Sequence, residues 1–321
     1  MKRITTGLMW LFMAALPGSA QGIVNNGNFT LALPSHQGQL TWSTSGFTLA
    51  QVLAKPNSAE VGVRANDASN QFSLLGFLFL FPDQAKCRDG VMEPMKKTNP
   101  TIKIAASTQM ARSEGPPLEL VAYVGQRQGG KLVYSIRGFL AVDDLCGDLE
   151  IYGNDDSVIR DPNLKKMWHS YHLDPQYLPK FNDIFQYAQI LYGNHMYEAA
   201  APIFEQALAT LQDVNDQTKW RRVATDQAGM AYGLAGDIPK ARALFNAAIA
   251  ADPDYPMYYY NLACADAEEK KLADARTHLQ QAFARKANVI QGETMPDPTK
   301  DDSFLPYRDN KEFWTFVQSL R

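Results

Sequence analysis

The sequence contains few of the residues that build covalently cross-linked or metal-stabilised folds. Its 321 residues include 3 cysteines and 5 histidines, and three cysteines are too few for a disulfide-built mini-protein or a four-cysteine zinc site. The chain also lacks an excess of positive charge, since 31 Lys and Arg residues stand against 34 Asp and Glu residues. This balance argues against nucleic acid as a partner. Beyond the N-terminal segment, the richest apolar run is Phe72–Phe81, which is too short to span a membrane.

What the chain does contain is enough apolar material for hydrophobic cores. Hydrophobic residues make up 45% of the sequence and aromatic residues 11%, which excludes a wholly disordered chain. The length predicts about two domains. The composition therefore indicates a soluble protein with two globular domains.

The first twenty residues have the pattern of a secretory signal peptide. Lys2 and Arg3 precede an apolar run, Gly7–Leu16, and small residues follow up to Ala20. This pattern predicts cleavage after Ala20. Because the apolar run is half as long as a membrane span, we expect no anchor. The mature protein is then periplasmic or secreted.

Residues 21–155 alternate between apolar and polar side chains, which predicts β-strands with one buried face. The alternation is clearest over residues 60–64, 102–110 and 132–140. The run Phe72–Phe81 does not alternate, so it predicts a central strand that is covered on both faces.

One predicted helix, Asp83–Lys97, interrupts these strands, and its apolar residues Cys87, Val91 and Met95 share a face. Strands on both sides of a helix predict an α+β domain in which an antiparallel sheet packs against a helix. This order of elements, with the stretch Gly46–Leu49, resembles the Mog1/PsbP-like α/β sandwich modules of bacterial envelope proteins.

Two cysteines of this domain, Cys87 and Cys146, are candidates for a disulfide that would join the helix to a strand. The alternative is two buried free thiols. Cys264 lies outside the domain and is expected to be a small buried residue or a reactive thiol.

After residue 155 the pattern becomes helical. Asp161 followed by Pro162 predicts a helix start, so residues 156–180 are expected to form a helical linker. Residues 181–321 then form the second domain.

Small residues recur in register in this second domain. Ala200, Ala241 and Ala275 are 41 and 34 residues apart, and Ala188, Gly229 and Ala263 repeat both spacings. A small residue on each helix lets two helix axes approach closely. This pattern resembles the tetratricopeptide repeat (TPR) over about residues 181–290. The resemblance implies an all-α solenoid of three helix pairs, in which Asp266 replaces an aromatic residue and predicts a looser fit.

A solenoid also needs a capping element at its end. Asp309 and Glu312 predict the start of such a helix near Asn310.

The TPR resemblance also implies a concave face, lined by the first helix of each pair, that binds a partner protein or peptide. The expected partner-binding residues are Asn182, Phe185, Gln189, Tyr192, Asp226, Met230, Met257 and Tyr260. Aromatic and methionine side chains with a few amides suit an extended peptide. The alternative is that Phe185 or Tyr260 simply packs inside the fold.

The sequence carries no catalytic or metal-binding signature. His169 and His172 lack a metal-ligand motif, and no phosphate loop or nucleophile motif is present. We therefore expect a non-catalytic protein-interaction scaffold, without cofactor or metal, in the cell envelope. Two alternatives stay open: an enzyme with its site in the N-terminal domain and TPR-mediated substrate recruitment, and a module that binds a small ligand behind Phe72–Phe81.

Overall fold

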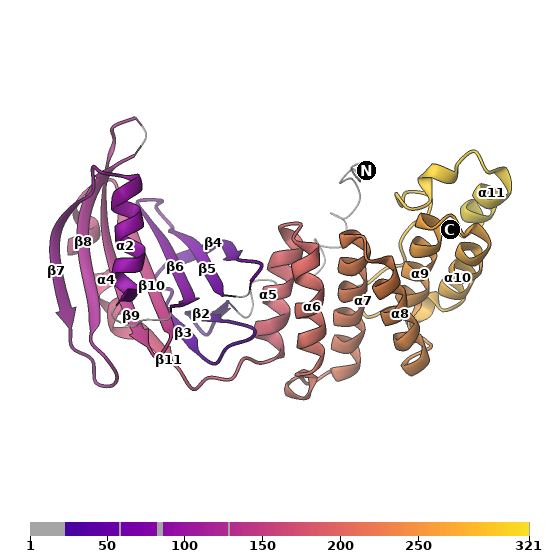
Figure 1. Ribbon diagram of the computed structural model, residues 1–321, viewed down its shortest axis with the longest axis horizontal. Helices are drawn as coiled ribbons and strands as arrows, with labels where there is room; N and C mark the ends of the chain where they lie inside the picture. The colour runs from indigo at the N-terminus through magenta and orange to yellow at the C-terminus, as the bar shows by residue number, and fades with distance from the viewer. Residues whose placement is uncertain (1–22, 58, 82–85, 128, 321) are drawn as a thin grey trace. The chain divides into compact units, whose positions relative to one another are not determined.

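The computed structural model describes residues 23–320, apart from residues 58, 82–85 and 128. Helices and antiparallel sheets both occur, so the fold is α+β, as the sequence predicted. The described residues divide into two compact units between Leu191 and Tyr192 (Figure 1). We call residues 23–191 the sheet unit and residues 192–320 the helical unit. The predicted signal peptide lies outside the described residues.

The sheet unit contains two antiparallel sheets, with strand orders β4-β5-β6-β10-β9-β8-β7 and β1-β2-β3-β11. The strands of the larger sheet are β4 (Phe47–Ala54), β5 (Glu60–Asp67), β6 (Phe72–Leu80), β7 (Lys103–Met110), β8 (Leu118–Gln126), β9 (Leu132–Val142) and β10 (Leu145–Gly153). Those of the smaller sheet are β1 (Val24–Asn25), β2 (Asn28–Ala32), β3 (Gln39–Ser43) and β11 (His172–Asp174). The helices are α2 (Cys87–Thr98), α3 (Ser157–Arg160), α4 (Pro162–Ser170) and α5 (Phe181–Gly193).

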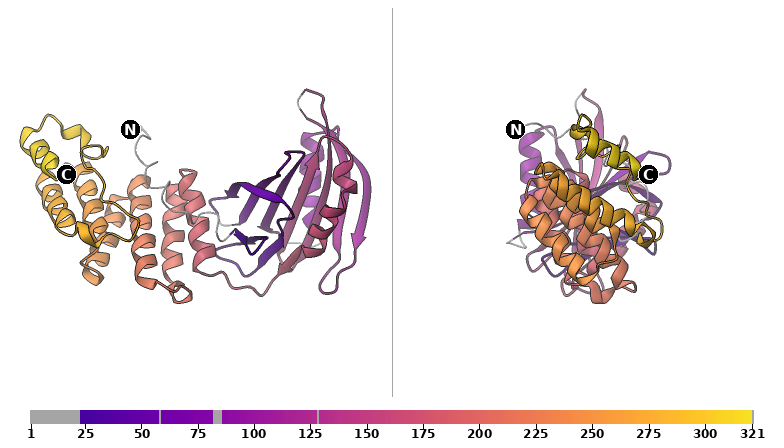
Figure 2. Two further views of the ribbon diagram at one scale, coloured as in Figure 1. Left: turned by 180° about the vertical axis from the view of Figure 1, so that it is seen from behind. Right: turned by 90° about the vertical axis from the view of Figure 1, so that its right-hand side faces the viewer.

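Different elements cover the two faces of the larger sheet, with α2 on one face and α4 on the other (Figure 2). On the α4 side, Trp168 packs on Gly138, and Trp42 of β3 packs on Gly76. A Cβ at Gly76 would lie 2.5 Å from the indole ring of Trp42. These glycines therefore leave room for bulky aromatic side chains to pack directly on the sheet.

Strand β6 is an interior strand, but the expectation that both of its faces are covered was wrong. Leu74 and Leu78 are buried, whereas Leu75 and Phe77 on the opposite face are half-buried. The reason is that the α2 side of the core is built mainly on β8, β9 and β10, so α2 leaves part of β6 uncovered.

Strand β7 confirms the predicted strand over residues 102–110, but its predicted buried face is absent. Lys103 to Gln109 are all exposed, and Ile104 is 43% exposed. The strand pairs with β8 at the end of the sheet, where neither α2 nor the smaller sheet covers it.

Cys87 and Cys146 form a disulfide, so the alternative of two free thiols was wrong. The bond joins the first residue of α2 to β10, and the two Cα atoms are 5.7 Å apart. Met92 of α2 and Phe139 of β9 are buried in the same cluster. The disulfide therefore attaches α2 to the sheet beside the apolar contacts that hold it there.

Replacing both Cys87 and Cys146 by alanine is expected to destabilise the sheet unit by about 2–4 kcal/mol, because the crosslink restricts the unfolded chain. The crosslinked residues are 59 positions apart. Urea unfolding followed by tryptophan fluorescence measures this change. Cys264→Ala, which removes the free cysteine, is the control, and equal stability of the two variants would contradict the expectation.

Residues 156–180, which we expected to be a linker, are built into the sheet unit. Helix α4 begins at Pro162, as predicted. Met167, Trp168 and Tyr171 are buried, and β11 pairs with β3. The aromatic side chains of this segment thus complete the core of the sheet unit.

Beyond Tyr192 the chain is helical. The helices are α6 (Tyr197–Leu208), α7 (Gln217–Ala235), α8 (Ile238–Ala251), α9 (Pro256–Glu268), α10 (Leu272–Ala284) and α11 (Lys311–Ser319), with short 3-10 turns at Leu211–Asp213, Lys286–Asn288 and Leu305–Tyr307. Helix α7 packs against α6, α8 and α9, and α9 packs against α8 and α10.

Small residues lie where these helices meet. A Cβ at Gly229 of α7 would lie 2.2 Å from the ring of Phe245 on α8. In the next helix pair, Ala263 of α9 and Leu279 of α10 are both fully buried in one cluster. The two pairs thus place a small and a large residue at corresponding positions of their interfaces.

Asp266 was expected to loosen the last helix pair, and this expectation was wrong. Its side chain is fully buried, with one carboxylate oxygen 2.8 Å from Arg242 of α8 and the other 2.6 Å from His278 of α10. The carboxylate therefore links α9 to both of its neighbours.

The predicted C-terminal helix is present as α11, but its cap differs from the expected pair of Asp309 and Glu312. The side chain of Asn310 accepts a hydrogen bond from the backbone N–H of Phe313. Phe313 and Val317 are buried in the cluster that contains Ala263 and Leu279, so α11 closes the end of the helical core.

Candidate functional site

The predicted binding residues of α7 and α9 lie under the chain segment that follows α10. On α7, Arg222, Asp226 and Met230 are four residues apart and share one face. Tyr255 precedes α9, and Tyr260 lies within it. We call the surface formed by these five residues the inner face.

Residues 286–299, which we call the strap, cover much of the inner face. The hydroxyl of Tyr255 donates to the carboxylate of Glu293, 3.1 and 3.0 Å from its two oxygens. The guanidinium of Arg222 donates to the carbonyl of Asn288 at 3.5 Å, and the amide of Asn288 donates to the carbonyl of Asp254 at 3.2 Å. The strap is therefore held by α7 and by the start of α9.

The chain after the strap is anchored more firmly. The hydroxyl of Tyr260 donates to Asp301 at 2.9 Å, and that of Tyr307 donates to the carbonyl of Ala267. Phe304 is fully buried, with its ring centroid 6.0 Å from that of Tyr260. Residues from Asp301 onward thus belong to the core of the helical unit.

Glu293 of the strap acts electrostatically on the buried carboxyl group of Asp226 on α7. Burial and the nearby Glu293 raise the pKa of Asp226 to about 8, although the amide of Asn261 donates to its carboxylate. Burial also raises the pKa of Glu293, against hydrogen bonds from the Ile290 N–H and from Tyr255. With the strap in place, Asp226 therefore keeps its proton at neutral pH.

The free cysteine, Cys264, lies beside the anchored segment. Its Sγ is 3.9 Å from the Asp301 carboxylate, and burial raises the pKa of the thiol well above its ordinary value. A protonated thiol is a poor nucleophile, so the geometry does not favour a reactive cysteine.

The predicted partner-binding residues differ widely in exposure. Asn182 is exposed, Gln189 and Met230 are half-buried, and Phe185, Tyr192, Asp226, Met257 and Tyr260 are buried. In the sheet unit, Phe185 stacks on Phe181 with ring centroids 5.2 Å apart. In the helical unit, Tyr192 packs edge-on against Phe204. Their role in partner binding stays a prediction, but the buried side chains already have packing partners within their own units.

Sequence reasoning missed the strap and the residues that hold it, Arg222 and Tyr255. A signal was present, because Gly292, Pro296 and Pro298 prevent a further helix after α10. These residues predict irregular chain, yet they do not show where that chain lies. Its position depends on contacts with residues 30–70 positions earlier, which no local pattern records.

The sheet unit contains a buried charged cluster on the α2 side of the sheet. Arg137 donates to both oxygens of Asp148 at 2.6 Å, and Tyr123 donates to Glu150. Burial would lower the pKa of Arg137, but Asp148 and Glu150 raise it. Arg137 and Asp148 are 6% and 2% exposed, and these groups satisfy one another. The cluster therefore favours a structural role rather than a catalytic one.

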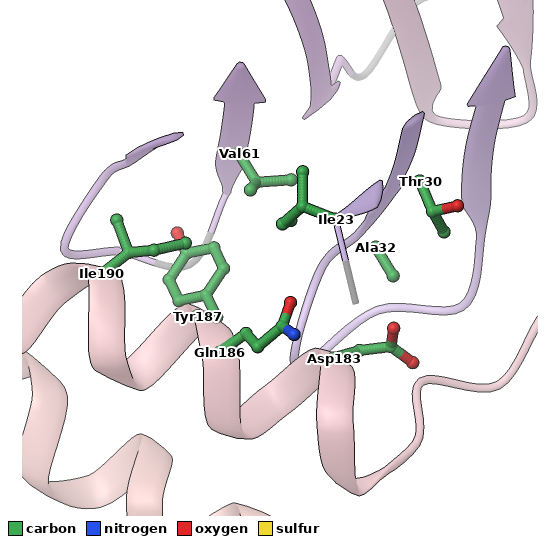
Figure 3. Close-up of a pocket in the computed structure, with 8 residues that line it drawn as sticks. All are labelled: Ile23, Thr30, Ala32, Val61, Asp183, Gln186, Tyr187 and Ile190. Atoms are coloured by element: carbon green, nitrogen blue, oxygen red, sulfur yellow. The ribbon is translucent and has the colours of Figure 1, made fainter. Parts of the chain in front are cut away.

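The sheet unit also has a small cavity between the sheets and α5 (Figure 3). Val61, Gln186 and Tyr187 line it, with five other residues. Its volume is about 10 Å³, which is room for no more than one water molecule. It is not behind Phe72–Phe81, and it does not suit an organic ligand.

Comparisons with known proteins leave the chain unassigned, because no family model and no curated protein matches it. Within residues 23–320, excluding the gaps given above, no helix is both long and apolar enough to cross a membrane. The same described residues contain no group of three or more His, Cys, Asp or Glu side chains that could hold a metal ion.

Proposed function

We propose that the protein is exported and binds a partner protein or peptide through the inner face of a TPR-type helical array, without catalysing a reaction. The array comprises the pairs α7/α8 and α9/α10, preceded by α6. Residues 1–20 serve as the signal peptide. The sheet unit accompanies this array as a separate module.

The repeated close packing of the helical unit carries this proposal. Gly229 against Phe245, and Ala263 with Leu279, occur at positions that the sequence repeats at a spacing of 34 residues. Arrays of this kind present a continuous inner surface, because each pair adds one helix to it. Extended peptides are typical occupants of such surfaces.

The part of the inner face beyond the strap supports a binding role. Met230 is half-buried on the same stripe as Arg222 and Asp226, and the space around Gly233 is open for at least 4 Å from an ideal Cβ. Methionine adapts its shape to different apolar partners. This end of the inner face therefore offers an accessible apolar contact.

The disulfide supports export. Structural disulfides persist in oxidising compartments and are rare in the cytosol, and Cys87–Cys146 attaches a helix of the sheet unit. Together with the expected signal peptide, this bond favours the periplasm or the extracellular space.

Met230→Lys tests the proposed surface. A lysine there places a charge in the apolar part of the inner face, so we expect partner affinity to fall by roughly tenfold or more. The measurement is affinity capture by the mature chain from an envelope extract, followed by a binding isotherm with the captured protein.

Ala247→Lys on the exposed side of α8 is the matched control, and it should leave that affinity unchanged. Equal loss in both variants, or no loss in Met230→Lys, would show that the partner does not bind at the inner face.

A further inference from the structure

The strap differs from the anchored segment in the contacts that hold it. From Asp301 onward, the chain is fixed by the aromatic cluster of Phe304 and Phe313. Residues 286–299 contribute fewer apolar contacts, from the buried Ile290 and from Met295, which packs partly buried against the same cluster. Hydrogen bonds from the side chains of Tyr255, Arg222 and Asn288 hold the rest of the strap. Hydrogen bonds of this kind can be replaced by hydrogen bonds to water or to a bound peptide with a small change in free energy. The strap is thus packed less firmly than the segment that follows it.

The strap uses the groups that a bound peptide would need. The Tyr255 hydroxyl donates to Glu293 of the strap. The Arg222 guanidinium, which pairs with Asp252 at 2.6 and 2.9 Å, also donates to the strap carbonyl of Asn288 at 3.5 Å. Residues 293–297 have no helix or strand of their own, so the strap crosses the inner face as an irregular chain. A partner segment and the strap cannot occupy these donors together.

We propose that the strap is an internal competitor, which occupies the inner face and is displaced by the partner peptide, and that loss of the Asp226 proton weakens its closure. This inference rests on the proposed function for its partner, but the opening of the strap can be measured without one.

The direction of the pH dependence follows from the two forms of Asp226. In the closed form, burial and Glu293 raise its pKa to about 8, whereas the ordinary value is 3.8. Opening of the strap removes Glu293 and admits water to Asp226, so we expect its pKa to fall towards the ordinary value and the open form to release the proton that the closed form binds. Closure is strongest at low pH, weakens as the pH rises from about 4 to about 8, and does not weaken further above that range.

Among the groups around Asp226, only Asp226 and Glu293 are expected to change protonation between about pH 4 and about pH 8. Asp226 faces Asn261 and the tyrosine hydroxyls of Tyr192, Tyr255 and Tyr258, and all three tyrosine pKa values are raised, so those groups stay neutral. Arg222 and Lys219 act on Glu293 from α7 and favour its ionised form. The proton of the closed pair therefore resides on Asp226.

Hydrogen exchange of the full mature chain tests the strap directly. We expect the protection factors of strap amides to fall by roughly tenfold or more between about pH 6 and about pH 8 in the wild type. Asp226→Asn mimics the protonated carboxyl, so its strap protection should stay constant over the same range. Ile290→Ser removes a buried apolar contact and should lower strap protection at every pH, while protection of α9 and α10 is kept.

A pH-independent strap in the wild type, or the same fall in Asp226→Asn, would overturn the proton-linked closure. A second measurement tests competition: Ile290→Ser should bind the captured partner roughly tenfold more tightly than the wild type, because no closed strap has to be displaced. Unchanged affinity would overturn the internal competitor and leave the proposed function standing. Failure of Met230→Lys to weaken binding would instead overturn the proposed function, while exchange still decides whether the strap opens.

Discussion

Replacing Asp266 by alanine is expected to destabilise the helical unit by about 2–4 kcal/mol, because Arg242 and His278 each lose their contact with a fully buried carboxylate. Asp266 is fully buried, and its two oxygens contact Arg242 and His278 from opposite neighbouring helices. Urea unfolding followed by far-UV circular dichroism measures the loss, since this unit supplies most of the helix.

Glu269→Ala is the matched control for this prediction. Glu269 also contacts Arg242, at 2.7 Å, but its side chain is 31% exposed, and exposed ion pairs contribute less than about 1 kcal/mol. The prediction is that Asp266→Ala lowers the free energy of unfolding by more than Glu269→Ala does. If both variants lose the same small amount of stability, Asp266 does not join the helices as we infer.

Replacing Asp148 by alanine is expected to cost the sheet unit a similar amount, about 3–5 kcal/mol. Arg137 makes two hydrogen bonds of 2.6 Å to this carboxylate, and its side chain is 7% exposed. Glu150 compensates only in part, because its nearest oxygen is 3.5 Å from the guanidinium. Tryptophan fluorescence during urea unfolding reports this transition, since Trp42 and Trp168 are buried in the same unit, on the other face of the sheet.

The double variant Arg137→Met, Asp148→Leu distinguishes the effect of losing the charges on stability from the effect of losing side-chain volume. It replaces the ion pair by apolar side chains of similar size, so its cost should be well below that of Asp148→Ala. A double variant that is less stable than the single one would mean that the ion pair itself stabilises the sheet unit. It would also reopen the question of a functional role for this cluster.

Local patterns in the sequence predicted the elements whose causes are local. Asp161 followed by Pro162 in the sequence predicted the start of α4. The alternation of apolar and polar residues predicted strands β5 and β9. For Cys87 and Cys146, which both lie in the strand-rich part of the sequence, two states were expected: a disulfide or two buried free thiols. These inferences used only short stretches of sequence and the oxidising compartment that the signal peptide predicts.

Features that depend on distant contacts could not be predicted in the same way. Residues 102–110 alternate like a half-buried strand, but β7 is exposed because the strand order places it at the sheet edge. Asp266 deviates from the repeat pattern, yet Arg242 and His278 compensate for it from other helices.

In the candidate site, too, local sequence patterns predicted some residues, whereas features that depend on distant contacts were missed. The sequence marked Asp226, Met257 and Tyr260 from their register on α7 and α9, whereas the strap that covers this face follows from its tertiary contacts. The sequence did not single out Tyr255 and Arg222, which hold the strap. A repeat pattern thus indicates which helices line a surface, but not what already lies on it.

Hydrogen exchange of the mature chain with and without its bound partner tests the central claim most directly. We predict increased protection in α7 around Met230 and in α9, together with decreased protection of residues 286–299 as the strap is displaced. Protection gained only within residues 23–191, with α7, α9 and the strap unchanged, would contradict the account and place partner binding on the sheet unit.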